Sequence, residues 1–215
     1  MSHGYLRGDV ATWLRELATP EHGQDPILDE MHALAAERDF PIIGPEVGRL
    51  LAQLATLTGA KRIFEMGSGF GYSTLFFARA AGPQARIWHT DGDPENTQMA
   101  KDFLGRAGVA ERVEFITGDA LAALAAQEGD FDIVFCDVDK HQYPQAYEIF
   151  ADRVRPGGVA IVDNLVWSGR VAAGDDDADT QGVRDYLQRM WSDHRYLSSL
   201  MPVRDGVGVS LRIGR

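Results

Sequence analysis

The sequence predicts an α/β protein built on a doubly wound, mostly parallel sheet of seven strands. Short apolar runs alternate with helical patterns after Gly59, and such alternation is typical of parallel strands joined by right-handed helical crossovers. Near the C-terminus, Asp205-Gly206 separates two strand-like runs, which predicts a hairpin. The hairpin should place one antiparallel strand near the edge of the sheet.

The first 58 residues are expected to be helical. Residues 10–17 carry apolar side chains at helical spacing, and Asp25-Pro26 is typical of a helix start, with a capping acid before a proline. A second start follows at Gly44-Pro45, after the extended segment 40–43. Because 215 residues suit one domain, we expect a single domain, in which an N-terminal helical cap (1–58) covers a core (59–215).

The expected strands of the parallel part span residues 62–66, 86–90, 113–117, 133–137 and 159–163, and the intervening helices begin near Tyr72, Pro94, Ala120 and Gln142. A helix near 181–191 should precede strands at 195–203 and 207–213, with the turn at residues 204–206. The acidic stretch 174–179 is interpreted as a solvated loop rather than as a metal site.

The composition limits the classes of partner. The net charge of −11 and the absence of a visible Lys/Arg cluster argue against nucleic acid and anionic membranes, because phosphate binding depends on basic side chains. The only cysteine, Cys136, lies in an expected strand and is interpreted as a core residue, so no disulfide is expected. No signal peptide or apolar stretch of spanning length is visible, so a cytoplasmic location is expected.

Acidic and amide side chains follow two of the expected buried strands. Asp137 and Lys140 come after one strand, and Asp163-Asn164 end the next. Ligands of parallel α/β sheets lie at the carboxyl ends of the strands, so these four side chains are expected to converge. Three oxygen ligands beside an amine suit a divalent cation and a proton acceptor, and the pattern points to an enzyme. The structural alternatives are that the acids cap their strands and that the lysine pairs at the surface with Asp139.

A glycine-rich turn, residues 67–71, closes the first strand and opens the following helix. Its glycines permit close backbone approach to a ligand, and the helix N-terminus offers N–H donors to a carboxylate or phosphate. The second strand ends on Asp91, in the place of an acid that binds ribose hydroxyls. The turn and the acid together predict a cofactor that contains adenosine.

The spacing of the turn helps to choose the cofactor. It reads G-x-G-x-G, with Glu65 two residues ahead, whereas the dinucleotide fingerprint is G-x-G-x-x-G. A carboxylate at this position would repel a pyrophosphate but could accept a hydrogen bond from an ammonium group. S-adenosylmethionine (SAM) carries an ammonium, a carboxylate and a sulfonium, and no phosphate, so we favour SAM over a dinucleotide.

These motifs resemble the cation-dependent O-methyltransferase family, which includes catechol and caffeoyl-CoA O-methyltransferases and bacterial small-molecule enzymes. The resemblance runs from Ile43 to the C-terminus and is strongest in residues 46–73, 131–143 and 157–171. It implies the Rossmann-like fold of class I SAM-dependent methyltransferases. Family members are commonly homodimers, and Trp13 and Trp191 are expected to pack in the core or against another subunit.

The resemblance also implies residue roles. It assigns Lys140 as the general base, and Asp137, Asp163 and Asn164 as ligands of Mg²⁺ or another hard cation such as Ca²⁺ or Mn²⁺. The implied cofactor contacts are Ile43, Glu65, Gly67, Ser68, Ser73, Asp91, Ala120, Asp137 and Asp139. Phe40, Trp167 and Ser168 are expected at the substrate.

Three departures from the family pattern concern the substrate. Ser168 stands where plant-type enzymes present asparagine, Asp139 replaces the tryptophan that gates the animal catechol site, and residues 1–40 match no known segment. The cap and the Trp167 loop are expected to wall the acceptor pocket. The identity of the acceptor therefore stays open.

The resulting hypothesis is SAM- and metal-dependent methylation of one hydroxyl of a vicinal aromatic diol. A chelated cation would lower the phenol pKa from about 10, and Lys140 would accept the proton if nearby positive charge depressed its own pKa. The alternatives are a tRNA modified-base O-methyltransferase, an NAD-dependent oxidoreductase and a non-catalytic nucleotide-binding protein. The acidic net charge disfavours the tRNA enzyme, and the spacing of the glycines disfavours the oxidoreductase. The complete set of candidate metal ligands disfavours a non-catalytic protein.

Overall fold

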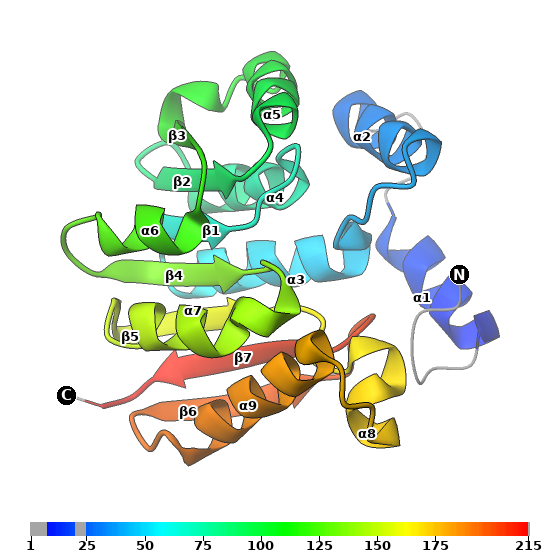
Figure 1. Ribbon diagram of the computed structural model, residues 1–215. Coiled ribbons are helices and arrows are strands. Elements are labelled where there is room, and N and C mark those ends of the chain that lie inside the picture. The colour runs from blue at the N-terminus through cyan, green and yellow to red at the C-terminus, as the bar shows by residue number, and fades with distance from the viewer. Residues whose placement is uncertain (1–7, 20–24, 215) are drawn as a thin grey trace.

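The computed structural model of the protein describes residues 8–19 and 25–214 (Figure 1). Its seven strands form one sheet in the order β3-β2-β1-β4-β5-β7-β6. Strand β7 runs antiparallel to both of its neighbours, β5 and β6, while β1 to β5 pair in parallel. The predicted fold class and the C-terminal hairpin are therefore confirmed. Residues 1–7 and 20–24 of the expected cap, and Arg215, lie outside the described residues.

The strands are β1 (Arg62–Met66), β2 (Arg86–Asp91), β3 (Val113–Thr117), β4 (Phe131–Cys136), β5 (Val154–Val162), β6 (Tyr196–Met201) and β7 (Val207–Arg212). The α-helices are α1 (Gly8–Ala18), α2 (Pro26–Glu37), α3 (Gly44–Leu57), α4 (Tyr72–Ala81), α5 (Pro94–Arg106), α6 (Ala120–Ala125), α7 (Tyr143–Phe150), α8 (Arg170–Ala173) and α9 (Ala178–Ser192). Short 3-10 helices span Ala110–Arg112, Lys140–Gln142 and Trp167–Gly169.

Helices cover both faces of the sheet, because successive strand residues point to opposite sides. Ile63 packs with the core that includes α3, α4 and α5, whereas its neighbour Phe64 packs with α6, α7 and α9. In β4, Ile133 and Val134 divide in the same way. Burial on both faces explains why the parallel strands carry nearly continuous apolar runs. Cys136 belongs to this core and is buried, as predicted.

Helices α1 and α2 lie beyond the ends of the parallel strands (Figure 1). Helix α3 packs firmly on the sheet through Val47, Leu51 and Ala55. Helix α1 has no buried residue and exposes 57% of Trp13. Trp191 is equally exposed, so the core alternative for these two tryptophans is wrong.

The structure corrects two element boundaries. Helix α9 begins at Ala178 rather than at residue 181, because the Asp177 side chain caps it by accepting from the Thr180 N–H. The acidic stretch is thus only partly a loop. Strand β5 begins at Val154, before the glycines that marked its expected start. Within the described ranges, no helix has both the length and the apolar character that a membrane span requires.

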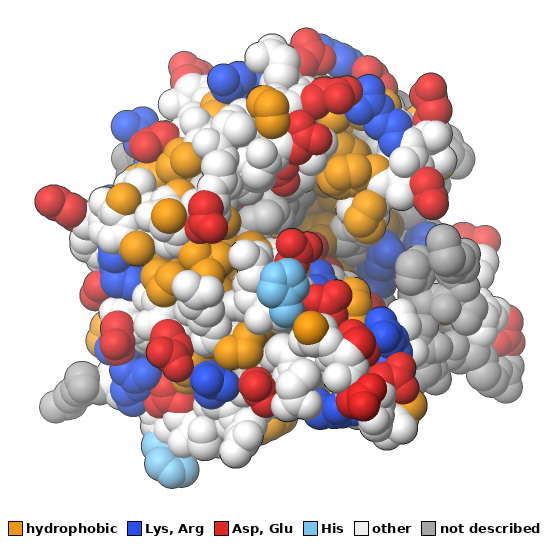
Figure 2. Space-filling view, viewed as in Figure 1, with side chains coloured by type: hydrophobic (Ala, Val, Ile, Leu, Met, Phe, Trp, Pro, Cys, Tyr) orange, Lys and Arg blue, Asp and Glu red, His pale blue; other side chains and the backbone are white. Residues whose placement is uncertain are grey.

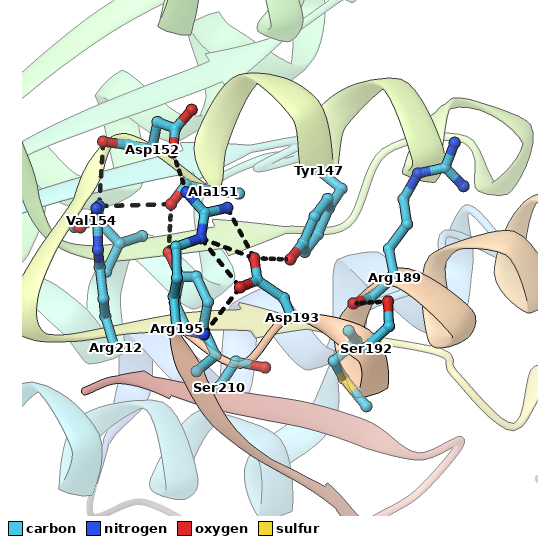
Figure 3. Close-up of polar contacts among 12 residues, drawn as sticks. Tyr147, Ala151, Asp152, Val154, Arg189, Ser192, Asp193, Arg195, Ser210 and Arg212 are labelled. Carbon is cyan, nitrogen blue, oxygen red and sulfur yellow. Dashed lines mark hydrogen bonds and ion pairs between the residues drawn. The ribbon is translucent and has the colours of Figure 1, made fainter. Parts of the chain in front are cut away.

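A polar cluster anchors the C-terminal hairpin to the neighbouring helix (Figure 3). The Asp193 carboxylate accepts from Tyr147 of α7 and from Nε, Nη2 and the backbone N–H of Arg195. Arg195 also pairs with Asp152, and Arg212 of β7 donates to the carbonyl oxygen of Val154 at 2.5 Å. These contacts fix the hairpin, whose turn reaches the site described below.

Candidate active site

A cavity of about 1320 Å³ opens where the parallel strands end, between the glycine turn and the N-terminal helices. Figure 2 shows acidic side chains around the hollow and Lys or Arg side chains to its lower right. All but one of the predicted site residues line this cavity. They are Phe40, Ile43, Gly67, Ser68, Ser73, Asp91, Ala120, Asp137, Asp139, Lys140, Asp163, Asn164, Trp167 and Ser168.

The exception is Glu65, which is not one of the lining residues. Its side chain is fully buried, and no hydrogen bond of good geometry reaches either carboxylate oxygen. Burial raises the pKa of Glu65 to about 7, although the nearby hydroxyls of Ser73 and Thr74 act in the opposite direction. Glu65 therefore lies behind the cavity wall, next to Ser73, which itself lines the cavity.

The glycine turn holds Asp91 in a fixed position. The N–H of Gly69 donates to Asp91 Oδ2 at 2.8 Å, and the Asn96 amide donates to Oδ1 at 3.0 Å. Gly67 has a φ of +80°, and a Cβ atom there would lie 2.4 Å from the carbonyl oxygen of Asp137. The close approach of the ends of β1 and β4 thus requires glycine at position 67.

Helix α4 begins directly after this turn. Its N-cap residue, Gly71, has a φ of 90°, and no side chain caps the helix. The first N–H groups of a helix lack intrahelical acceptors and favour an anion. Ser73, in the first turn of α4, lines the cavity beside them. This end of the cavity is therefore suited to a small carboxylate.

Lys140 and Asp137 form an ion pair inside the cavity. Lys140 Nζ lies 2.8 Å from Asp137 Oδ1 and 3.3 Å from the Val138 carbonyl oxygen. The ammonium also lies 5.4 Å from the centre of the Tyr143 ring and 5.5 Å from that of Trp167. Aromatic faces attract a cation at such distances, so the chain holds the lysine from three sides.

The charge environment of Lys140 differs from the one expected. Burial lowers the pKa of Lys140. The carboxylates of Asp137 and Asp163 together raise it by more than burial lowers it, so the net shift is upward. A depressed pKa of Lys140 was expected only if positive charge lay nearby, and these protein groups supply negative charge instead, so that expectation stays a prediction. The physical reason for the upward shift is that the predicted metal ligands are themselves two anions next to the lysine.

Asp163 is a buried carboxylate with an unsatisfied oxygen. Its side chain is almost inaccessible, and Oδ1 has no hydrogen-bond partner. Burial and the charge of Asp137 raise the pKa of Asp163 to about 7. Such an arrangement is costly unless a cation or a proton compensates it.

The donor set around Asp163 suits a hard cation. Among the described residues, no group of three or more His, Cys, Asp or Glu side chains is arranged to hold a metal ion. The predicted set consists instead of Asp137, Asp163 and the amide of Asn164, which all line the cavity. Oxygen donors of these types are ligands of Mg²⁺ and Ca²⁺. The third ligand would therefore be an amide rather than a carboxylate.

The Trp167 loop is held by the C-terminal hairpin. Asp205 Oδ1 accepts from the Ser168 N–H at 2.6 Å, and the Asp205 carbonyl oxygen accepts from the Val166 N–H at 2.8 Å. Trp167 and Ser168 both have positive φ angles, of 50° and 53°. Because non-glycine residues rarely adopt this conformation, these contacts define how the indole faces the cavity.

Sequence reasoning did not identify three cationic or polar lining residues, Arg15, His32 and Arg204. His32 Nε2 lies 2.7 Å from the Tyr72 hydroxyl, and burial lowers the pKa of this histidine. Arg204 had been assigned only a turn position. No local signal marks any of the three, because their places on the wall depend on contacts between distant parts of the chain.

Comparisons with known proteins agree with this geometry. A family model described as O-methyltransferase matches residues 19–213. The catechol O-methyltransferase of Mycobacterium tuberculosis is 39% identical over 172 residues, which cover 78% of each chain. A caffeoyl-CoA O-methyltransferase of Mesembryanthemum crystallinum is 34% identical and covers 99% of this chain and 90% of its own.

A solved structure of an O-methyltransferase is also similar to this chain. The O-methyltransferase TomG from Streptomyces achromogenes, involved in tomaymycin synthesis and solved in complex with SAM, has a TM-score of 0.85 and 31% identity, and 96% of each chain is covered. The sequence matches, the fold and the cavity at the carboxyl ends of the strands all lead to one conclusion: the chain belongs to the O-methyltransferase family.

Proposed function

We propose that this protein is a SAM-dependent and divalent-cation-dependent O-methyltransferase that methylates one hydroxyl of a vicinal aromatic diol. The observation that carries the proposal is the buried Asp163 carboxylate, whose Oδ1 has no partner. It shares one cavity with Asp137, Lys140 and the glycine turn. The names of the catechol and caffeoyl-CoA enzymes among the relatives support the acceptor class.

The proposed SAM contacts form two groups beside the glycine turn, one for the ribose and one for the methionine carboxylate. Asp91, already oriented by Gly69 and Asn96, would accept from the ribose hydroxyls. The N-terminus of α4 and Ser73 would bind the methionine carboxylate. The remaining proposed contacts, which all line the cavity, are Ile43, Gly67, Ser68, Ala120, Asp137 and Asp139.

For the cation, the proposed ligands are Asp137, Asp163 and Asn164. When bound, a hard cation such as Mg²⁺, Ca²⁺ or Mn²⁺ would supply Lewis acidity that lowers the pKa of a coordinated phenol. The unsatisfied Oδ1 of Asp163 and its raised pKa support this ligand set, because a cation would remove the cost of burying the carboxylate.

Lys140 is the proposed acceptor of the hydroxyl proton. Its ammonium is held by Asp137 and by the rings of Tyr143 and Trp167. The carboxylates that raise its pKa are also the proposed metal ligands, so their charge would be neutralised in the loaded site and the lysine could release its proton. The resulting phenolate would attack the sulfonium methyl group. Alignment of the two reactants can lower the barrier by roughly 7–11 kcal/mol.

The N-terminal cap is proposed to form the acceptor side of the pocket. Cavity-lining residues of α1 and α2 include Arg15 and His32. The Phe40 ring packs against that of Phe70 in a tilted arrangement, with 5.0 Å between the ring centres, and would lie only 3.0 Å from a Cβ atom at position 69. Phe40, Trp167 and Ser168 would therefore enclose an aromatic acceptor and exclude water from it.

One experiment tests the proposed function directly. Purified protein would be incubated with SAM and a panel of catechols, with Mg²⁺ or with EDTA, and the products would be analysed by mass spectrometry. We expect replacement of one hydrogen by a methyl group in the Mg²⁺ samples only. In calorimetric titrations, S-adenosylhomocysteine should bind and NAD should not. Methylation of no catechol under any condition would refute the proposal.

We also propose that the protein forms a homodimer. The support is the exposed apolar surface of α1, on which Trp13 is 57% and Leu17 63% exposed. Isolated exposed apolar residues are normal, but adjacent ones often mark interfaces. Light scattering should give the mass of two chains, and the double variant Trp13→Ser and Leu17→Ser should give the mass of one. A wild-type monomer would contradict this proposal.

A further inference from the structure

Arg204 reaches from the β6–β7 turn into the cavity wall. Its own φ is 48°, and its side chain extends over Gly44 at the start of α3. A Cβ atom on Gly44 would lie 1.6 Å from Arg204 Nη1. The guanidinium thus occupies the space that a side chain at position 44 would need, and only 19% of the arginine side chain is exposed.

The donors of this partly buried guanidinium form no hydrogen bond with the described residues. Among the residues that the structure describes, Arg204 makes no hydrogen bond, and its ion-pair partner, Glu46 Oε2, lies 4.0 Å from Nη1. Elsewhere in the chain, half-buried arginines donate directly to carboxylates, as Arg155 does to Asp132 at 2.5 Å. A guanidinium carries five donors, and those of Arg204 therefore remain available to a ligand that enters the cavity.

The local charge is also unbalanced. Glu46 is shared between two cations, because Arg15 Nε lies 3.8 Å from its Oε1 while Arg204 approaches Oε2. Neither distance allows a hydrogen bond, and Glu46 Oε2 has no other partner. These two guanidiniums and one carboxylate carry a net charge of +1, and the carboxylate of Asp205 adjoins them on the cavity wall. The planar fork of Arg204 remains open to a further hydrogen-bond acceptor.

This wall faces the proposed acceptor rather than lying on the outer surface. Arg204, Arg15, Asp163 and Trp167 all line the same cavity. The adjacent acid, Asp205, is occupied by the Ser168 N–H.

We propose that Arg204 binds a carboxylate on the acceptor, so that the preferred acceptors are vicinal aromatic diols that carry an acid group. This inference rests on the function proposed above. The planar fork of a guanidinium matches a carboxylate through two parallel hydrogen bonds. Arg15 strengthens the attraction by its charge, and Glu46 lies between the two arginines as a shared ion-pair partner.

A carboxylate of the cofactor is the other anion that could meet Arg204. The N-terminus of α4, with Ser73 beside it, already offers uncompensated donors for the methionine carboxylate. We therefore assign Arg204 to the acceptor. Acceptor kinetics and cofactor affinity, measured on the same variants, show whether Arg204 binds the carboxylate of the acceptor or that of the cofactor.

The test compares two acceptors that differ by one charge, protocatechuate and its methyl ester, at saturating SAM and Mg²⁺. Wild-type protein should favour the acid. In Arg204→Met, which keeps an unbranched flexible side chain but removes the guanidinium, KM for protocatechuate should rise about tenfold to a hundredfold, far more than KM for the ester, with little change in kcat. Arg204→Lys should recover part of the loss. Arg38→Met, outside the cavity, serves as the matched control.

Each other outcome has a distinct meaning. Equal kcat/KM of wild-type protein for the acid and the ester would overturn the inference and leave the proposed function intact. Parallel losses for both acceptors, together with weaker binding of S-adenosylhomocysteine to Arg204→Met, would assign Arg204 to the cofactor and also overturn it. Methylation of neither acceptor, nor of any catechol, would refute the proposed function, and the inference with it.

Discussion

Lys140 Nζ lies 2.8 Å from Asp137 Oδ1, and both side chains are largely buried in the cavity wall. This pair joins the two tasks proposed for the site, because Asp137 is a candidate metal ligand and Lys140 the candidate base. As long as Asp137 and Asp163 are both anionic, the lysine retains its proton. The pair thus links proton transfer at Lys140 to charge compensation at the two carboxylates.

Replacement of Lys140 by methionine should remove the chemistry and preserve binding. Loss of a general base typically lowers kcat about 10²–10⁴-fold. Affinity for S-adenosylhomocysteine should stay close to that of wild type, because Lys140 is not a proposed cofactor contact. Steady-state kinetics and calorimetry measure the two quantities, and Lys101→Met on α5 is the control. Normal kcat in Lys140→Met would exclude the assigned role.

Asp163→Asn should separate metal dependence from folding. The variant loses a carboxylate that is buried without a partner at Oδ1, so we expect the metal-free protein to be at least as stable as wild type. Methylation should be lost. A ligand that binds the folded state raises the melting temperature, so Mg²⁺ should stabilise wild-type protein and not the variant. Thermal unfolding with and without Mg²⁺ measures this, and an equal response of both proteins would argue against Asp163 as a ligand.

Glu65→Gln should stabilise the protein at neutral and alkaline pH. Burial raises the pKa of Glu65 from 4.5 to about 7, so the unfolded chain loses this proton at lower pH than the folded chain. The contribution of Glu65 to stability is therefore present below pH 4.5 and is lost as the pH rises to about 7. We expect the variant to exceed wild type by about 2–3 kcal/mol at pH 8.

Urea unfolding at pH 4.5 and pH 8 checks the Glu65 prediction, since the difference between the two proteins should disappear at the lower pH. The same variant tests the cofactor contact that the family resemblance implies. Because Glu65 does not line the cavity, we expect little change in the affinity for S-adenosylhomocysteine. A large loss of affinity would show that the carboxylate acts on the cofactor from behind the wall.

Asp193→Asn should weaken the fold without touching the chemistry. Hydrogen bonds from Arg195 hold the pKa of Asp193 well below its usual range (Figure 3). Slight burial acts in the opposite direction, and the hydrogen bond from Tyr147 lowers the pKa further. The stabilisation is complete above the unfolded pKa of about 3.9 and is lost as the pH falls below it. At pH 7 the variant should lose about 1–3 kcal/mol of stability.

Thermal unfolding and turnover of Asp193→Asn, both at pH 7, distinguish these effects. We expect a lower melting temperature and an unchanged kcat at a temperature where the variant remains folded. Asp185→Asn, on the exposed surface of α9, is the matched control for the loss of one carboxylate. A variant as stable as wild type would indicate that the cluster does not anchor the hairpin.

Most of the fold follows from local patterns in the sequence. The strands β1 to β5 each contain a short stretch rich in apolar residues, and the turn at residues 204–206 carries the Asp-Gly signal of a hairpin. The start of α9 at Ala178 was missed because its capping acid, Asp177, stands in an acidic stretch that has the composition of a loop. In that case a single side-chain hydrogen bond decides the boundary.

The candidate site was predictable where strand ends decide the geometry. Asp137, Asp163 and Asn164 follow adjacent parallel strands and therefore meet in one cavity. Glu65 lies within a strand, and it shares a face of the sheet with Ile63 two residues earlier, under α4. The period of two along β1 thus explains why Glu65 lies apart from the cavity. Arg204 was unpredictable, because its neighbour Gly44 is 160 positions away in the sequence.

The contact between Gly44 and Arg204 also constrains how this protein can diverge. A residue that tolerates the φ of +73° at position 44, such as asparagine, would still need the volume that the guanidinium fills. A side chain at position 44 would therefore require the far end of the flexible Arg204 side chain to move. The two positions are coupled, because a residue other than glycine at position 44 would displace the guanidinium from its present place on the cavity wall.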